Sequence, residues 1–293
     1  MLFTNTELNH FAKDPAVVFF RGQYFMYYSI CHDDGRFGVG IATSANMEDW
    51  TLQGEIPQDC PCESKGIAAP GAIVLDDEIH VFYQTYGNGR QDALCHAVSA
   101  DGFTFRKNPE NPVFRPSEDW CCGRAIDADV CLFKDKLFLY FATRDHDMKV
   151  QKVGGAWAEV NSGFGKDAWH QVARQSLLMP ELKWEGECIE APATIVDNGK
   201  MYMFYGGSYN CTPQQIGCAV SEDGIFFQRT SAEPFIPCGA PDAWNSSESG
   251  HPYAFRDHDG KAHLFYQGSS DMGKTWYLSR VEIAFADGKP VLK

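Results

Sequence analysis

The chain has 293 residues, of which 44% are hydrophobic and 14% aromatic, so it is long enough to bury a sizeable core in one domain. Its formal net charge of −14 argues against nucleic acid as a partner, because nucleic-acid binding requires basic patches that displace counterions. The N-terminus shows no basic segment followed by an apolar run, and no apolar stretch approaches the roughly 20 residues of a membrane span. We therefore expect a cytoplasmic protein with no membrane partner.

Five segments in chain order share an apolar run, a polar turn and a second run rich in aromatic residues, a pattern typical of a β-hairpin. They begin at Asp14, Ala69, Asp127, Glu190 and His251. These starts are roughly 55 to 63 residues apart, a spacing typical of propeller blades. We predict an all-β fold, a five-bladed β-propeller with four-stranded antiparallel blades, formed by residues 1–293 as a single domain.

Three of the five hairpins begin with an acid, namely Asp14, Asp127 and Glu190. The innermost strands of a propeller surround a central channel, so equivalent positions in different blades lie at the same end of it. The pattern therefore predicts three carboxylates that converge from blades one, three and four. Like charges at close range repel and raise one another's pKa, so catalysis explains this arrangement better than a purely structural role does.

Each acid also has a structural interpretation. A proline follows Asp14, and Asp-Pro is a common entry from a turn into a strand. Asp127 stands in an apolar strand, where a buried carboxylate needs a partner such as Arg124. Asp129 is two residues further on, is expected on the same strand face, and is an alternative third acid. Glu190 lies between apolar residues, which predicts a raised pKa that suits a proton donor near neutral pH.

Eleven cysteines are scattered through apolar runs and loops, and we expect buried, reduced thiols rather than a disulfide framework. Cys60, Cys62 and the adjacent pair Cys121 and Cys122 are candidates for metal binding. Neither group has the paired C-x-x-C spacing of a structural zinc site, so we do not expect zinc.

Three short motifs contain the acids: Asp14 lies in KDPAVV, Asp127 lies in AID, and Glu190 stands two residues before Pro192. In these motifs the chain resembles the five-bladed propeller glycosidases of glycoside hydrolase family 43 and its clan relatives in families 32 and 68. The resemblance covers nearly the whole chain and keeps the order Asp, Asp, Glu. It implies inverting hydrolysis of arabinofuranosides, xylosides and related plant-polysaccharide fragments. The implied roles are general base for Asp14, general acid for Glu190, and tuning of the acid's pKa for Asp127.

The resemblance also implies that His251 helps to hold a calcium or other ion on the propeller axis through water, although no cofactor is required. An oligosaccharide is the implied partner. We expect Arg144, His251, Tyr28 and Tyr86 to contact it, because aromatic rings stack on sugar faces and long donors reach hydroxyl groups. Family members often have Pro and Gly after the second and third acids, where this chain has alanines. This difference leaves the sugar, its linkage and the oligomeric state open.

Three alternatives remain. A retaining fructan or sucrose hydrolase of the same clan would use Asp14 as a nucleophile, with carboxyl groups about 5–5.5 Å apart instead of about 6.5–9.5 Å. Those enzymes usually have Asn and Arg where this chain has Lys13 and Ile126. A mannoside phosphorylase would need a basic phosphate pocket, to which Arg124 and Arg144 could contribute. A sugar-binding propeller without catalysis is the third alternative, and it has no need of a complete acid trio.

Overall fold

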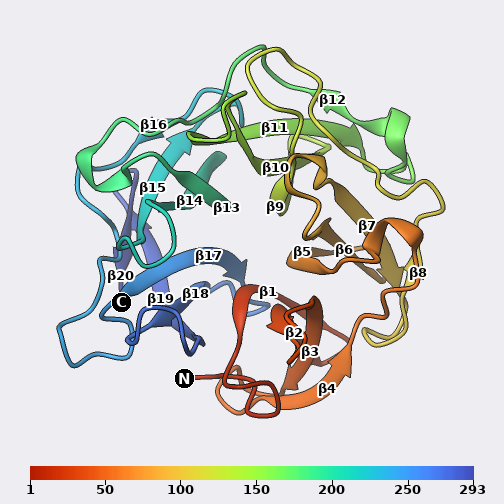
Figure 1. Cartoon of the computed structure of the whole chain (residues 1–293). Helices are drawn as coiled ribbons and strands as arrows, with labels where there is room; N and C mark the ends of the chain where they lie inside the picture. Colours follow the sequence, from red (N-terminus) through yellow and green to blue (C-terminus); the bar gives the residue numbers. More distant parts are fainter.

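The computed structural model describes residues 1–293 and contains five four-stranded antiparallel sheets. The sheets stand around one axis as the blades of a propeller, with the first strand of each blade innermost (Figure 1). Within every blade the strands follow one another in chain order from the axis outwards. The predicted all-β, five-bladed propeller is therefore confirmed.

The strands of each blade have the following bounds. Blade one contains β1 (Lys13–Phe20), β2 (Gln23–Cys31), β3 (Phe37–Ser44) and β4 (Thr51–Glu55). Blade two contains β5 (Ile67–Leu75), β6 (Glu78–Thr85), β7 (Leu94–Ser99) and β8 (Arg106–Lys107). Blade three contains β9 (Ile126–Phe133), β10 (Lys136–Arg144), β11 (Gln151–Glu159) and β12 (His170–Gln171).

Blade four contains β13 (Ile189–Asp197), β14 (Lys200–Gly207), β15 (Gln215–Ser221) and β16 (Gln228–Arg229). Blade five contains β17 (Glu248–Arg256), β18 (Ala262–Ser269), β19 (Tyr277–Ala286) and β20 (Lys289–Leu292). The helices are single turns of 3-10 type, η1 (Pro61–Glu63), η2 (Gly89–Gln91), η3 (Lys166–Ala168) and η4 (Lys183–Glu185). None has the length and apolar character that a membrane crossing requires.

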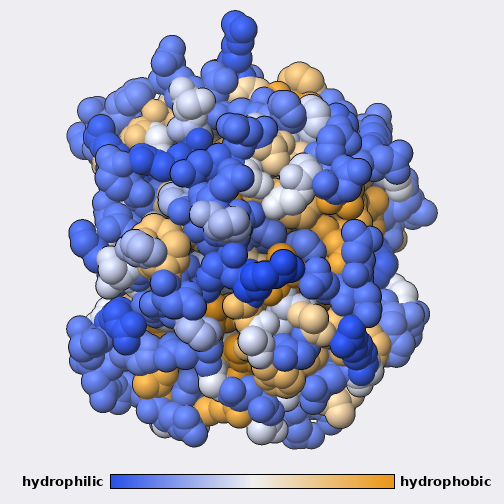
Figure 2. Space-filling model, turned by 90° about the vertical axis from the view of Figure 1, so that its right-hand side faces the viewer, coloured by the Kyte–Doolittle hydropathy of each residue, from blue (hydrophilic) through white to orange (hydrophobic).

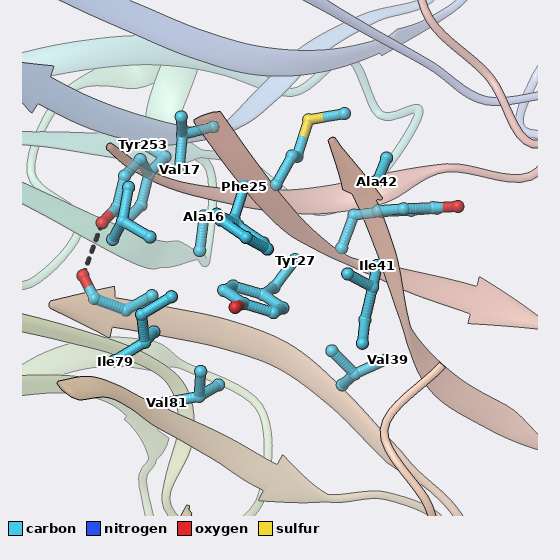
Figure 3. Close-up of a cluster of buried hydrophobic side chains, with 14 of the residues drawn as sticks. Ala16, Val17, Phe25, Tyr27, Val39, Ile41, Ala42, Ile79, Val81 and Tyr253 are labelled. Atoms are coloured by element: carbon cyan, nitrogen blue, oxygen red, sulfur yellow. Dashed lines mark hydrogen bonds between the residues drawn. The ribbon is translucent and has the colours of Figure 1, made fainter. Parts of the chain in front are cut away.

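Apolar side chains fill the space between neighbouring blades. Phe25 and Tyr27 of β2 pack with Ile79 and Val81 of β6 in the cluster shown in Figure 3. Tyr253 of β17 reaches the same cluster, and its hydroxyl donates a hydrogen bond of 2.7 Å to a backbone carbonyl of β5. The aromatic-rich runs thus form the core because alternate residues of each strand face the neighbouring blade.

The N-terminal segment closes the ring. Phe3 and Leu278 of β19 exchange backbone hydrogen bonds of 2.8 and 2.7 Å, which attaches the first residues of the chain to blade five. The chain then continues into β1, the innermost strand of blade one. The side of the molecule shown in Figure 2 is mostly hydrophilic with small apolar areas, in keeping with the high net charge.

Every innermost strand carries a β-bulge at the same place, shown by a slip in its pairing with the second strand. One residue at each bulge has a positive φ: Asp14 (51°), Ala69 (44°), Asp127 (54°), Ala191 (49°) and His251 (40°). A bulge bends the strand and redirects its side chain, so these five positions ring the axis.

The bulges correct one part of the sequence interpretation. Ala191 is the counterpart of Asp14 in blade four, so Glu190 stands one residue earlier, at the position of Lys13 in blade one. Our alignment of Glu190 with Asp14 and Asp127 was therefore wrong by one residue. Glu190 approaches the axis from a different backbone position.

Side chains of the preceding blade hold four of the five bulges. The bulge N–H groups donate hydrogen bonds to Ser29 Oγ (from Ala69, 2.8 Å), Gln84 Oε1 (from Asp127, 2.7 Å), Gln214 Oε1 (from His251, 3.2 Å) and Gln267 Oε1 (from Asp14, 3.1 Å). A buried N–H without an acceptor costs about 1–3 kcal/mol, so these bonds stabilise the bulges. They also fix the backbone that carries the axial side chains.

Candidate active site

The structure brings Asp14, Asp127 and Glu190 together with His251 at the axis. All four side chains are nearly inaccessible to solvent, with between 5% and 10% of their surface exposed. The five bulges enclose a cavity of about 20 Å³, which is large enough for one water molecule or ion but not for a sugar ring. A sugar would therefore have to bind above the acids rather than between them.

His251 lies between two of the carboxylates. Its Nδ1 atom is 2.7 Å from Oδ1 of Asp14, and its Nε2 atom is 3.1 Å from Oε1 of Glu190. Burial alone would lower the pKa of His251, but the two carboxylates outweigh that effect and raise the pKa well above its ordinary value. The ring is therefore an imidazolium that offsets the charge of two buried acids.

Asp14 is ionised. Burial by itself would raise the pKa of this carboxyl, but the charges of His251 and Lys13 and hydrogen bonding from His251 and Ser29 hold it at about 2. A general base must be unprotonated at the working pH, and Asp14 meets this condition.

Glu190 is held by three donors from three different segments. Gln151 Nε2 of β11 hydrogen-bonds to Oε2, while Gln214 Nε2 (2.6 Å) and His251 Nε2 (3.1 Å) contact Oε1. Burial favours a higher pKa for Glu190, but these donors and the nearby charge of Lys13 lower it below its ordinary value. The raised pKa that we predicted from its apolar sequence neighbours is thus wrong, because polar donors from elsewhere in the chain surround the carboxylate.

Asp127 behaves in the opposite way. Burial, with the neighbouring charges of Glu190 and Asp14, raises the pKa of Asp127 to about 7. Its Oδ2 atom has no hydrogen-bond partner in the protein. The expected partner Arg124 instead pairs with Asp92 at 3.3 Å, so that prediction is also wrong. A carboxyl that is half-protonated near neutral pH can exchange protons with its neighbours.

Asp129 does not share the position of Asp127. The bulge interrupts the alternation of side chains between them, and Oδ2 of Asp129 accepts hydrogen bonds from the backbone N–H (2.9 Å) and the hydroxyl of Thr194 on β13. Asp127 lines the axial cavity and Asp129 does not. The expectation of a common strand face is therefore wrong, and the structure favours Asp127 as the third acid.

The structure places the two tyrosines that we predicted as sugar contacts in different environments. Tyr28 is 1% exposed, its hydroxyl accepts a hydrogen bond of 3.0 Å from Asn5, and it belongs to the core of blade one, so its assignment as a sugar contact is wrong. Tyr86 is half-buried and stacks on Phe37 with ring centroids 4.3 Å apart. Burial is the main cause that raises the pKa of Tyr86, and the charges of Lys13 and Asp14 have the next largest effects on it. The Tyr86 hydroxyl therefore lies near Asp14.

Arg144 supports the site from the side of blade three. Its Nε atom donates a hydrogen bond of 2.7 Å to Oε1 of Gln151, whose amide group holds Glu190. Its guanidinium lies over the ring of Tyr209, 5.1 Å from the centroid. Arg144 is therefore a positioning residue for Gln151, and it has no carboxylate partner of its own among the ion pairs of the chain.

Sequence reasoning missed the glutamines. Gln267 accepts the N–H of Asp14 and donates to Oε1 of Glu248 at 2.6 Å, and Gln84 accepts the N–H of Asp127. Both follow an aromatic pair in the second strand of their hairpin, in the repeated letters FYQ. That repeated motif was the available signal. Gln151 and Gln214 likewise occupy equivalent positions in blades three and four, three residues before Gly154 and Gly217, in the shared pattern Q-x-x-G.

Asp127, Glu190 and His251 are the three groups whose ligand atoms lie within 4.8 Å of one another. Calcium takes six to eight oxygen ligands, so this trio would fill only part of its coordination sphere. Both ring nitrogens of His251 face carboxylates, which leaves no free lone pair directed at the axis. An ion at this place would need water molecules as ligands, as the resemblance implied for His251.

The comparisons with known proteins agree with the five-bladed fold. A family-43 glycoside hydrolase described as thermostable superimposes with a TM-score of 0.79 over 99% of this chain and 96% of its own, at 19% identity. An endo-1,4-β-xylanase from Bacteroides thetaiotaomicron gives 0.78 over 99% and 97%, at 20% identity. A family 32 β-fructofuranosidase from Bombyx mori gives 0.73 over 96% of this chain and 62% of its own, at 18% identity.

No curated protein sequence matches the chain. The model of the family described as glycosyl hydrolases family 43, however, matches residues 3–290. That match spans nearly the whole propeller and all four axial residues. The protein is therefore a glycoside hydrolase, and the chain belongs to family 43.

Proposed function

We propose that the protein cleaves arabinofuranoside- or xyloside-type bonds in plant-polysaccharide fragments with inversion of the anomeric centre. Asp14 is the general base that activates water, Glu190 is the general acid that protonates the leaving oxygen, and Asp127 tunes the pKa of that acid. The observation that carries this proposal is the pairing of an ionised Asp14 with a hydrogen-bonded Glu190 on either side of His251.

The position of His251 supports inversion over retention. An inverting enzyme needs about 6.5–9.5 Å between its carboxyl groups to admit a water molecule, whereas a retaining enzyme needs about 5–5.5 Å. Here an imidazole ring contacts Asp14 through one nitrogen and Glu190 through the other. The ring keeps the two carboxylates apart, which favours the wider spacing.

His251 also explains how a glutamate with a lowered pKa can act as an acid. The proton on Nε2 of His251 faces Oε1 of Glu190 at 3.1 Å. Its transfer to Oε1 turns an imidazolium and a carboxylate into a neutral ring and a neutral acid, with no change in net charge. Glu190 can then deliver this proton to the glycosidic oxygen, while Asp14 removes a proton from the attacking water.

The substrate class rests on relatives of the same fold. The xylanase named above and an exo-1,5-α-L-arabinanase from a bovine ruminal metagenomic library both have this architecture, the latter with a TM-score of 0.68 over 96% of each chain, at 18% identity. Near the acids, Tyr86 could stack on a sugar ring, and Arg144, whose guanidinium has no carboxylate partner, could donate to sugar hydroxyls. An oligosaccharide is therefore the proposed partner.

The test uses aryl arabinofuranosides and xylosides with leaving groups of different pKa. Glu190→Gln should lose activity most on the poorest leaving group, because good leaving groups need no proton. Asp14→Asn should lose activity on all of them equally, and it serves as the matched control. NMR of the first sugar released should show the inverted anomer. A retained anomer would overturn the inverting assignment, and equal turnover by wild type and Glu190→Gln would overturn the acid role.

A calcium ion on the axis stays a separate prediction. Asp127, Glu190 and water molecules would hold it, with His251 reaching it only through water, and it would supply positive charge beside the acids. No step above depends on it. Titration of chelator-treated protein with calcium, followed by thermal unfolding, measures whether the ion binds.

A further inference from the structure

Three cysteine thiols lie in contact in blade two, away from the acids. Sγ of Cys60 is 3.3 Å from Sγ of Cys62, which is itself 3.8 Å from Sγ of Cys95. Cys60 and Cys62 flank Pro61 at η1 and are half-buried, while Cys95 is buried on β7. Cys62 is thus the central member of the group, in contact with both other thiols, and it is partly accessible.

The other blades show that this position does not require a thiol. In every blade an aromatic residue of the second strand pairs with a small residue of the third. The pairs are Tyr28 with Gly40, Tyr83 with Cys95, Phe141 with Gly154, Tyr205 with Gly217, and Tyr266 with Ser279. Glycine or serine therefore satisfies the packing in four blades, and blade two alone has a cysteine.

The segment that carries Cys62 has a direct counterpart in blade four. Both η1 and η4 end in a buried glutamate, Glu63 and Glu185. Cys62 directly precedes Glu63, and Trp184 directly precedes Glu185. Trp184 packs against Gly217, just as Cys62 contacts Cys95. Blade two therefore replaces a tryptophan and a glycine with two sulfur atoms in contact.

The buried glutamate holds this segment in place without help from the thiols. Oε1 of Glu63 accepts hydrogen bonds from the hydroxyl of Tyr83 (2.5 Å) and from Nζ of Lys107 (3.0 Å). In blade four, Glu185 makes the same kind of contacts with Tyr205 and Arg229, each at 2.8 Å. The buried glutamate holds the segment in both blades, so the thiols of blade two are not needed to hold it and are available for a chemical role.

The environment of Cys62 favours its reactive form. Hydrogen bonding from Cys95 is the main cause that lowers the pKa of Cys62 to about 6, against the effect of burial, with a further contribution from Cys60. The thiolate is the nucleophilic form of cysteine, and a partly exposed thiolate beside a second thiol is the usual arrangement of an oxidation-sensitive site. By contrast, burial raises the pKa of the half-exposed Cys31.

We propose that Cys62 is a thiol-oxidation site that takes a hydroperoxide as co-substrate and that Cys95 resolves the product into a disulfide. The Cys62 thiolate attacks one peroxide oxygen, the O–O bond breaks, and the other oxygen leaves as water or an alcohol after it takes a proton. Cys62 becomes a sulfenic acid. The Cys95 thiol then attacks Sγ of Cys62, an S–S bond forms, and water leaves. The two thiols lose two electrons in total, and the peroxide gains them.

The experiment treats the reduced, full-length protein with hydrogen peroxide and maps the products by peptide mass spectrometry. We expect a peptide pair linked through Cys62 and Cys95 that dithiothreitol separates. Cys95→Ser should stop the reaction at the sulfenic acid, which dimedone traps on Cys62. Serine stands at the equivalent place in blade five, so this variant should fold. Cys31→Ser is the control and should form the disulfide at the wild-type rate.

Three results would overturn the proposal. The first is oxidation of Cys62 no faster than that of Cys31. The second is a disulfide between Cys62 and Cys60 that leaves Cys95 free. The third is stoichiometric binding of zinc, added alone to the reduced protein, that Cys62→Ser abolishes, because the sulfur atoms would then be metal ligands.

Discussion

Oδ1 of Asp14 lies 2.7 Å from Nδ1 of His251, and these two residues come from opposite ends of the chain. The first and fifth blades meet where the ring closes, so a base from β1 and a cation from β17 become neighbours. Through its other nitrogen the same ring contacts Glu190. One imidazolium thus links the proposed base and the proposed acid.

Replacement of His251 by glutamine should change the pH dependence of activity. The variant loses the charge that lowers the pKa of Asp14 to about 2 and the proton that Glu190 needs. The acidic limb of kcat/KM should therefore move to higher pH, and kcat should fall by about 10²-fold or more. His263→Gln, a change in β18 away from the acids, is the control. An unchanged acidic limb in His251→Gln would contradict the role of the ring.

Gln151→Met should affect the acid alone. Gln151 hydrogen-bonds to Glu190, and this donor stabilises the ionised form. Without it the pKa of Glu190 should rise, so the alkaline limb of kcat should move to higher pH while the acidic limb stays in place. Steady-state rates between pH 4 and 9 measure both limbs, and Gln171→Met in β12 is the matched control. A shift of the acidic limb instead would mean that Gln151 acts on Asp14.

Asp129 should make stability depend on pH. Burial raises the pKa of Asp129 to about 7 in the folded protein, above the ordinary value of 3.8, despite hydrogen bonds from Thr194. Its contribution to stability is therefore fully present below about pH 4 and is lost as the pH rises through 7. Relative to Asp129→Asn, the wild type should lose stability on the order of a few kcal/mol over this range. Urea unfolding at several pH values measures the difference, and the exposed Asp59→Asn should show none.

Gly217→Ala should destabilise blade four. A Cβ atom at this position would collide with the ring of Tyr205 and lie 2.8 Å from a ring atom of Trp184, both of which are held by hydrogen bonds. Overpacking of this kind costs about 1–3 kcal/mol. Ser279→Ala at the equivalent place in blade five is the control, because a Cβ atom already fits there and the change removes only the hydrogen bond from Ser279 Oγ to the carbonyl of Met1. Equal midpoints of thermal unfolding for the two variants would contradict the packing argument.

The repeated pattern was enough to predict the fold and to single out the axial residues. Apolar runs separated by polar turns indicate hairpins, and the regular spacing of five hairpins indicates a propeller. Both are local or periodic properties that a linear sequence contains. The motif FYQ in blades two and five was also present in the sequence, although its meaning depended on knowing that its glutamines accept the bulge N–H groups of blades three and one.

The repeats and their first residues were therefore sufficient to predict a five-bladed all-β propeller with Asp14, Asp127, Glu190 and His251 near its axis. The folded chain alone shows the one-residue offset of Glu190, the separation of Asp127 from Asp129, and the burial of Tyr28 in the core. It also reversed the expected shift in the pKa of Glu190. A bulge changes which way a side chain points, and a pKa depends on burial and on charges from segments distant in the chain. Neither follows from the residues on either side of an acid.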